Sequence, residues 1–385
     1  MKLKPIPVFI ILAALTAGLI LDHPESNAEA PGLRHLVETA PTTWGPAGLS
    51  PSLSHDLNME IVLENTAIPE RDLLDLAIRL QRAPADLPRV VRTEPVPRQA
   101  GDQEAFWISD QSMSDYFQAT ATLRYVNSHV YMWVENGYNV SEEALLLSAE
   151  RFASRTYPRT RQFFGSEWSP GVDGDPRIHI YNGYVPGVGG YYSSADQFSR
   201  LVNPYSNERE MVYINLNNAS PGTDYYDGIL AHEFQHMIHW HNDRNEETWV
   251  NEGLSELSAY LNGFDTSGAV GTFARQPDTQ LTGWADSPGQ AGAHYGAAYS
   301  FMYYLLQRFG EDFIRDFVAD KENGLKSLEQ VLAARGVHLT ANDVFADWVI
   351  ANYLGDPHVA PDGRFGHRVA AIPMVHDVTH EAYPV

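Results

Sequence analysis

Histidines and acidic residues gather between residues 231 and 256, which read AHEFQHMIHWHNDRNEETWVNEGLSE. His232 and His236 are four residues apart, so on a helix their rings project from one face, one turn apart. Two imidazoles at this spacing can both reach one Zn²⁺ ion at about 2.0–2.1 Å. Glu233 lies next to the first histidine, and its carboxylate can reach a water molecule at the metal without binding the ion. This is the HExxH arrangement, and it predicts a hydrolytic zinc site.

A catalytic zinc site needs a third protein ligand and leaves the fourth position for water. One version of the motif places a third histidine six residues after the second, but Asn242 occupies that position here. The other version takes a glutamate from the next helix, and Glu252 lies early in an apolar-periodic segment that follows a polar turn. Glu256 lies one turn further along the same face. We expect it to accept an N–H from a ligand histidine and fix that ring.

Two other histidines follow the motif. His239 lies on the same helical face as His236, but it is a full turn further along and beyond easy reach of the same ion. We interpret it as a polar residue near the helix end. His241 is favoured as a cation that interacts with the carboxyl end of the helix dipole.

HEFQH, followed sixteen residues later by the glutamate of NEGLSE, resembles the gluzincin metallopeptidases. The likeness is closest to secreted bacterial peptidases of the hyicolysin and immune inhibitor A kind. It covers residues 227–262 and extends over roughly residues 100–320. It implies a zincin-like fold, zinc as the cofactor and hydrolysis of peptide bonds. The GxMEN-type stretch that the aminopeptidase-N branch uses for a free amine is absent, which favours an endopeptidase.

Carried over residue by residue, the resemblance implies three zinc ligands, His232, His236 and Glu252. It also implies that Glu233 is the general base. The alternative is a non-catalytic extracellular binding protein that keeps a degenerate peptidase fold. Such a protein should have lost the base or a ligand, and all four positions are filled here.

A hydrogen-bond donor for the oxyanion formed during peptide hydrolysis is expected in AHYGAAYSFMYYLLQRFG. His294, Tyr295 and Tyr299 are the candidates. The aminopeptidase-N branch has a tyrosine at the start of a comparable helix, and Tyr295 matches it best. The alternative is a tyrosine-rich buried helix that takes no part in chemistry.

Two segments are candidates for contact with a substrate. GGYYSSAD is either an edge strand beside the metal-binding helix or a surface loop. An edge strand would allow an extended peptide to pair with it. Residues 272–287 either line the specificity pocket or belong to the core through Phe273, Leu281 and Trp284.

The elements that must position these residues indicate an α+β fold. We expect residues 101–242 to form a β-rich half, an N-terminal mixed sheet with the active-site helix at 227–242. Residues 243–385 form a mainly helical half, with helices at 249–262 and 294–309 among others. The order of the elements is therefore that of an α+β layout.

The first 100 residues differ in composition from the rest of the chain. Lys2 and Lys4 precede an apolar run from Val8 to Leu21, and Ala28-Glu29-Ala30 follows, which predicts a signal peptide over residues 1–30 and a secreted protein. The alternative is an uncleaved membrane anchor, although this run is shorter than the ~20 residues that a spanning helix needs. Residues 31–100 are an N-terminal extension or a propeptide, ending in a proline-rich linker.

Composition excludes several partners and sites. The formal net charge of −23 argues against nucleic acid and anionic membrane surfaces as partners. The resemblance to peptidases implies a protein or peptide substrate. No second long apolar run follows the first, so we expect no membrane insertion of the mature chain. Cysteine is absent, which excludes disulfides and cysteine-ligated zinc. Asp173 and Asp175 flank a glycine and predict either a Ca²⁺ site or a plain turn. The oligomeric state is left open.

Overall fold

The computed structural model describes residues 72–80, 82–265, 267–285 and 290–367. The predicted signal peptide, and the extension up to residue 71, lie outside the described residues. The first described element is the short helix α2 (Leu73–Arg79). Asp72 caps it by accepting backbone N–H groups of its first turn.

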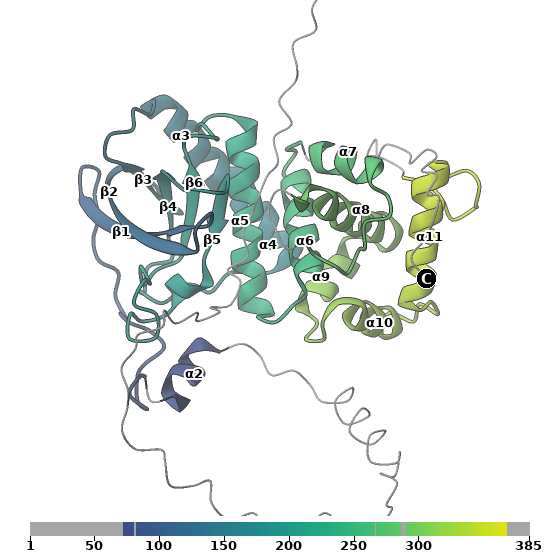
Figure 1. Ribbon diagram of the computed structural model, residues 1–385, viewed down its shortest axis with the longest axis horizontal. Helices are drawn as coiled ribbons and strands as arrows, with labels where there is room; N and C mark the ends of the chain where they lie inside the picture. Colours follow the sequence, from purple (N-terminus) through teal and green to yellow (C-terminus); the bar gives the residue numbers. More distant parts are fainter. Residues whose placement is uncertain (1–71, 81, 266, 286–289, 368–385) are drawn as a thin grey trace, which may run out of the picture. The chain divides into compact units, whose positions relative to one another are not determined.

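A six-stranded mixed sheet follows, in the order β1-β2-β3-β4-β6-β5. The strands β3, β4 and β6 run parallel, and the other neighbours pair antiparallel (Figure 1). The strands are β1 (Gln103–Asp110), β2 (Asp115–Val126), β3 (Val130–Glu135), β4 (Ile178–Gly183), β5 (Gly190–Tyr192) and β6 (Met211–Asn215).

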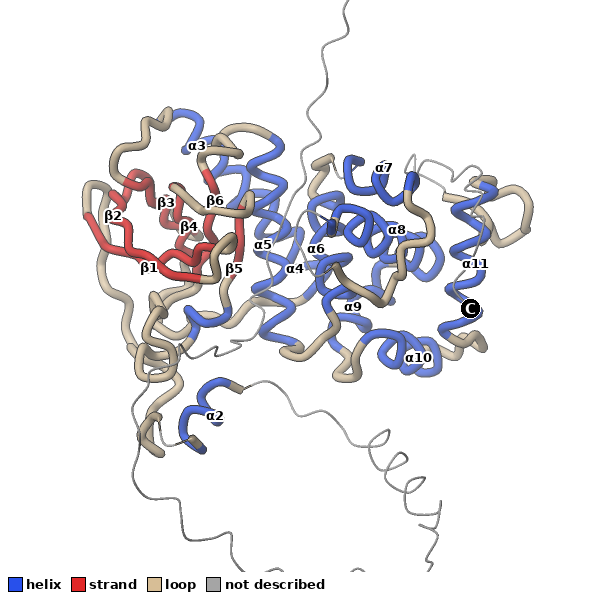
Figure 2. The backbone as a smooth tube through the Cα atoms, viewed as in Figure 1, coloured by secondary structure: helices blue, strands red, loops and turns tan. Residues whose placement is uncertain are grey.

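The central strands of this sheet are buried on both faces. In β3, Val130 and Met132 belong to the large core cluster that the helices share, whereas Tyr131 and Trp133 face a second cluster. Phe106 of β1 is part of that second cluster, because β1 and β2 curl over the sheet (Figure 2). Strands covered on both sides are expected to be rich in apolar residues throughout, as β3 is.

Strand β5 forms one edge of the sheet, which confirms the edge strand expected in GGYYSSAD. A Cβ at Gly190 would lie 2.6 Å from the Cγ2 atom of Ile229 on helix α5 (Asp224–Asn242). The absence of a side chain therefore lets this edge strand run directly against the helix that carries the HExxH motif.

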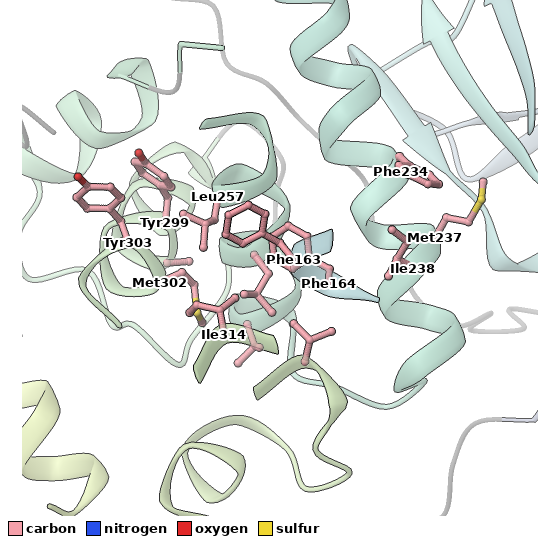
Figure 3. Packing of buried hydrophobic residues seen from close by; sticks show 14 of the residues in the cluster. Phe163, Phe164, Phe234, Met237, Ile238, Leu257, Tyr299, Met302, Tyr303 and Ile314 are labelled. Atoms are coloured by element: carbon pink, nitrogen blue, oxygen red, sulfur yellow. The ribbon is translucent and has the colours of Figure 1, made fainter. Parts of the chain in front are cut away.

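Thr223 is the N-cap of helix α5, and its hydroxyl accepts the backbone N–H of Tyr226. Its apolar side is buried, and Phe234, Met237 and Ile238 project from one stretch of it (Figure 3). Helix α5 lies between the sheet and the helices that follow it (Figure 1). The motif is therefore held inside the molecule by packing on two sides.

The helices before and after α5 complete the architecture and give the mainly helical second half that the sequence predicts. The earlier ones are α3 (Glu142–Arg151), η1 (Phe152–Thr156) and α4 (Tyr157–Phe164). The later ones are α6 (Thr248–Leu261), α7 (Ser267–Arg275), α8 (Gly292–Phe309), α9 (Glu311–Ala319), α10 (Gly324–Ala334) and α11 (Ala341–Leu354). None of the described helices has both the length and the apolar character needed to cross a membrane.

Helix α6 makes the contacts that matter most for the site. It packs on α5 and on α8, and Gly253 lets α6 and α8 approach closely, since a Cβ there would lie 2.8 Å from the carbonyl oxygen of Ala298. The side chain of Ser258 donates to the carbonyl oxygen of Ala231 on α5 at 2.9 Å. These contacts fix α6 beside the HExxH motif.

Candidate metal centre

The side chains of His232, His236 and Glu252 converge at the contact between α5 and α6. The Nε2 atoms of the two histidines are 3.0 Å apart. The Glu252 Oε2 atom lies 3.2 Å from Nε2 of His232 and 3.4 Å from Nε2 of His236. Around a tetrahedral zinc ion with bonds of about 2.0–2.1 Å, ligand atoms are about 3.3–3.4 Å apart. The three atoms therefore form a triangle of the size that such an ion requires.

The rest of α6 orients the two imidazoles. Glu256 Oε1 forms an ion pair with Nδ1 of His232 at 3.2 Å. The N–H of the His232 ring is not aligned for a hydrogen bond with this carboxylate. Nδ1 of His236 lies 2.6 Å from Asn251 Oδ1 and 3.1 Å from Ser255 Oγ. The outer nitrogen of each ring is thus held by α6, which leaves both Nε2 atoms directed at the common centre.

Sequence reasoning identified Glu256 but missed Asn251 and Ser255. The signal was present, because Asn251 and Ser255 are four residues apart, directly before the Glu252 and Glu256 pair. On a helix these are two adjacent columns of side chains. In the structure Asn251 and Ser255 contact His236 and Glu256 contacts His232, whereas Glu252 faces both rings.

Glu233 lies beside the triad but outside the group of ligand atoms. It is 1% exposed, and the backbone N–H of Tyr192 on β5 donates to its carboxylate. Among the described residues, its Oε1 atom has no hydrogen-bond partner. Burial raises the pKa of Glu233, although the positive charges of the two nearby imidazoles oppose this.

The charge balance of the centre favours a bound cation. Three carboxylates, those of Glu233, Glu252 and Glu256, are buried together. Within the described part of the chain, the ion pairs that they form are with histidine only. Burial tends to raise the pKa of Glu252, but the histidines lower it to about 2, so this carboxylate stays ionised. Buried negative charge of this kind requires a counter-cation.

The structure places Tyr295 at the centre and Tyr299 elsewhere. Tyr295 is buried, its hydroxyl donates to Glu252, and its ring centroid lies 6.4 Å from that of His232. Burial, followed by the charge of Glu252, raises its pKa well above the usual value, so the hydroxyl keeps its proton. Tyr299 lies beside Tyr303 (Figure 3), and its ring also packs against Tyr260.

The segment at residues 272–287 has a mixed role. Phe273 and Leu281 are buried in the large core cluster, as one of the two interpretations expects. Trp284 is half-buried, and its ring makes an edge contact with Tyr295 at a centroid distance of 5.0 Å and lies 5.6 Å from the ring of His294. Trp284 thus contacts the centre indirectly, through Tyr295. Residues 286 and 287 lie outside the described residues.

The region of Asp173 and Asp175 has the contacts of a turn. Asp175 accepts hydrogen bonds from Tyr131 at 2.7 Å and from the guanidinium of Arg177 at 3.1 Å. Asp173 accepts the backbone N–H of Asp175 at 3.1 Å. Neither aspartate belongs to a group of three ligands among the described residues. The hydrogen bonds are those of a turn, and the Ca²⁺ alternative stays a prediction.

No protein-family model matches this sequence, and a search of curated proteins finds no significant relative. The functional interpretation therefore depends on the geometry of the centre. What that geometry establishes is a buried group of two imidazoles and one carboxylate that could hold a metal ion.

Replacing Glu256 by glutamine is expected to weaken zinc affinity at this centre by about 10–100-fold, because His232 loses the charge that orients its ring. The measurement is a competition titration against a chromophoric chelator. Glu142→Gln is the matched control, because that side chain is 82% exposed on α3. Unchanged zinc affinity in Glu256→Gln would show that Glu256 does not support the ligand.

Proposed function

We propose that the protein is a secreted, zinc-dependent metallopeptidase of the gluzincin type that hydrolyses internal peptide bonds. The observation that supports this most directly is the triangle of His232, His236 and Glu252, with the carboxylate of Glu233 beside it but outside the ligand set. A purely structural zinc site would be closed by a fourth protein ligand. The secreted location depends on the character of the N-terminal sequence alone.

The ligand set fits zinc in its catalytic form. Two neutral imidazoles and one carboxylate, with a position left for solvent, are typical of zinc hydrolases. When bound, zinc supplies Lewis-acid chemistry, because it polarises a carbonyl group and makes water more acidic.

Glu233 is the group that handles the proton. The Tyr192 N–H holds its carboxylate in place, and Oε1 is left to accept a proton from the attacking water. The same proton then passes to the nitrogen of the leaving amine as the C–N bond breaks. The raised pKa of Glu233 suits a group that must both accept and release a proton near neutral pH.

The edge strand β5 suggests how a substrate is held. An extended peptide can add to a free sheet edge through backbone hydrogen bonds. The Tyr192 N–H on β5 points to Glu233, so this edge runs beside the general base. A peptide bound along β5 would have residues on both sides of the scissile bond, which favours an endopeptidase.

The test is incubation of the purified protein with a peptide library in H₂¹⁸O, followed by mass spectrometry. We expect cleavage at internal bonds, one ¹⁸O atom in each new carboxylate, loss of activity with a zinc chelator and recovery on addition of Zn²⁺. A folded, zinc-loaded protein that cleaves no member of the library would overturn the proposal in favour of a non-catalytic metal-binding protein.

Tyr295→Phe is expected to lower kcat by about a hundredfold, with KM and bound zinc nearly unchanged, because the hydroxyl stabilises the oxyanion of the transition state. Steady-state kinetics and metal analysis measure both. Tyr299→Phe is the matched control, one turn further along α8 and packed against other tyrosines. Full activity in Tyr295→Phe would leave this tyrosine a structural partner of Glu252.

A further inference from the structure

A second group of metal-binding side chains lies where α5 ends. His239 is in the last turn of α5, Asp243 is its C-terminal cap, and Glu246 belongs to the turn that leads to α6. Each offers one ligand atom, and these three atoms lie within 4.8 Å of one another. This group, called the turn cluster below, shares no residue with the HExxH triad.

We propose that the turn cluster binds a second divalent cation of the zinc and cobalt class. An imidazole with two carboxylates is a mixed nitrogen and oxygen ligand set that suits borderline metals rather than Mg²⁺ or Ca²⁺. The proposal does not depend on peptidase activity.

His239 supports the proposal because it is buried as a neutral imidazole, which is the form of histidine that binds metals. The side chain is 1% exposed, and among the described residues its Nδ1 atom has no hydrogen-bond partner. Burial, with the positive charge of His236, lowers its pKa to about 3, so the ring is neutral at physiological pH. A buried ring nitrogen without a partner is costly unless a water molecule or an ion binds it.

The two carboxylates support it as well, because Asp243 is buried, Glu246 is half-buried and their negative charges repel each other. Asp243 is 2% exposed. Burial, together with the negative charges of Asp243 and Glu247, raises the pKa of Glu246 to about 8. A carboxyl group held in this way gains most from a cation that neutralises both acids at once.

The backbone around Glu246 positions its side chain before any ion binds. Its Oε1 atom accepts the N–H of Gly324 at 2.8 Å and also that of Glu247. Asp243 is fixed at the helix end, where its N–H donates to the carbonyl oxygen of His239 at 2.6 Å. The backbone thus holds the side chains of Asp243 and Glu246 close to His239 before an ion binds.

Lys321 is the competing source of positive charge. Its ammonium group donates to the carbonyl oxygen of Asn242, and its charge contributes to the lowered pKa of His239. If lysine alone neutralises the acids, the turn cluster should bind no metal. If metal binds, Lys321→Met should strengthen binding several-fold, since a like charge is removed.

A bound ion would act on the turn between the two helices that form the HExxH centre. Asn251 of α6 contacts Nδ1 of His236 and also hydrogen-bonds to the ring of His239. Fixing His239 and the turn therefore also fixes the approach of α6 to α5. We expect the second ion to contribute to stability rather than to the chemical step.

The test is metal analysis after equilibrium dialysis of the full chain at low micromolar free Zn²⁺. We expect two equivalents in the wild type, one in Glu246→Gln, one in Glu252→Gln and none in the double variant. Glutamine at 246 can still accept the Gly324 N–H, so the turn should keep its fold, which circular dichroism checks. With Co²⁺, the visible bands of the second site should persist in Glu252→Gln and disappear in Glu246→Gln.

A wild-type protein that binds one equivalent, with none left in Glu252→Gln, would overturn the second site. This outcome is separate from the fate of the proposed peptidase activity. An inactive protein with two equivalents would contradict only the peptidase, whereas an active protein with one equivalent would contradict only the second site.

Discussion

Glu233→Gln is expected to lower kcat for peptide hydrolysis by about 10²–10⁴-fold while the protein stays folded and keeps its zinc. Glutamine has nearly the same shape, and it can still accept the Tyr192 N–H that holds the native carboxylate. It cannot take a proton from water near neutral pH. The loss should therefore fall on the chemical step, with KM and zinc content close to those of the wild type.

Three measurements separate this expectation from a structural effect. The thermal unfolding temperature and the zinc content should match those of the wild type. The kcat measured by steady-state kinetics on a peptide identified from the library should be lower. Glu142→Gln on the exposed surface of α3 makes the same chemical change away from the centre and should keep full activity. A Glu233→Gln protein that still hydrolyses casein at the wild-type rate would remove Glu233 from the mechanism.

The parts of the fold that sequence could predict are those set by local patterns. The HExxH helix has two signals, histidine spacing and buried apolar residues such as Phe234 and Ile238, and the structure confirms it. The pair of glycines before Tyr191 was a signal for the edge strand, because glycine in a strand often marks a close approach of another backbone or helix, as at Gly190 here. These signals lie within single segments of the chain.

The sequence did not predict helices α7 and α11 of the second half, because neither shows the apolar periodicity of an amphipathic helix. Helix α7 is short and carries two glycines, Gly268 and Gly271, which are poor helix formers. Helix α11 is apolar on more than one face, and Phe345, Val349 and Tyr353 are exposed, so it shows no clean periodicity. The capping box of Thr340 and Asp343 was a usable signal for its start.

The candidate centre likewise has features that the sequence could predict and features that it could not. Positions four residues apart on one helix are fixed by helix geometry, so the arrangement of His232 and His236 followed from spacing. The hydrogen bond from Tyr192 to Glu233 joins a strand to a helix through a backbone group, and no side-chain pattern encodes it. The turn cluster depends on the path of the loop after Asp243, which spacing alone does not give.

Glu252→Gln is expected to remove one equivalent of zinc and to abolish hydrolysis. Zinc held by a complete ligand set contributes about 10–16 kcal/mol in small domains, so one ligand of four is worth about 3 kcal/mol, or more than a hundredfold in affinity. The loss of the Glu252 charge lowers zinc affinity further. The Oε2 atom of Glu252 lies 3.2 Å from Nε2 of His232 and 3.4 Å from Nε2 of His236, so its charge also acts on both ligand rings. Zinc content and activity should therefore fall together.

The choice of glutamine keeps this test interpretable. An alanine would leave the Tyr295 hydroxyl without its buried acceptor. It would also remove the carboxylate from the buried ion pairs with His232 and His236, and breaking a buried ion pair can cost about 3–5 kcal/mol of stability. Glutamine retains a carbonyl oxygen for that hydroxyl, so the protein should fold with a circular dichroism spectrum like that of the chelator-treated wild type. If Glu252→Gln keeps every zinc equivalent, the third ligand lies elsewhere. The peptidase proposal then loses the geometry that supports it, because the two histidines alone do not define a catalytic zinc site.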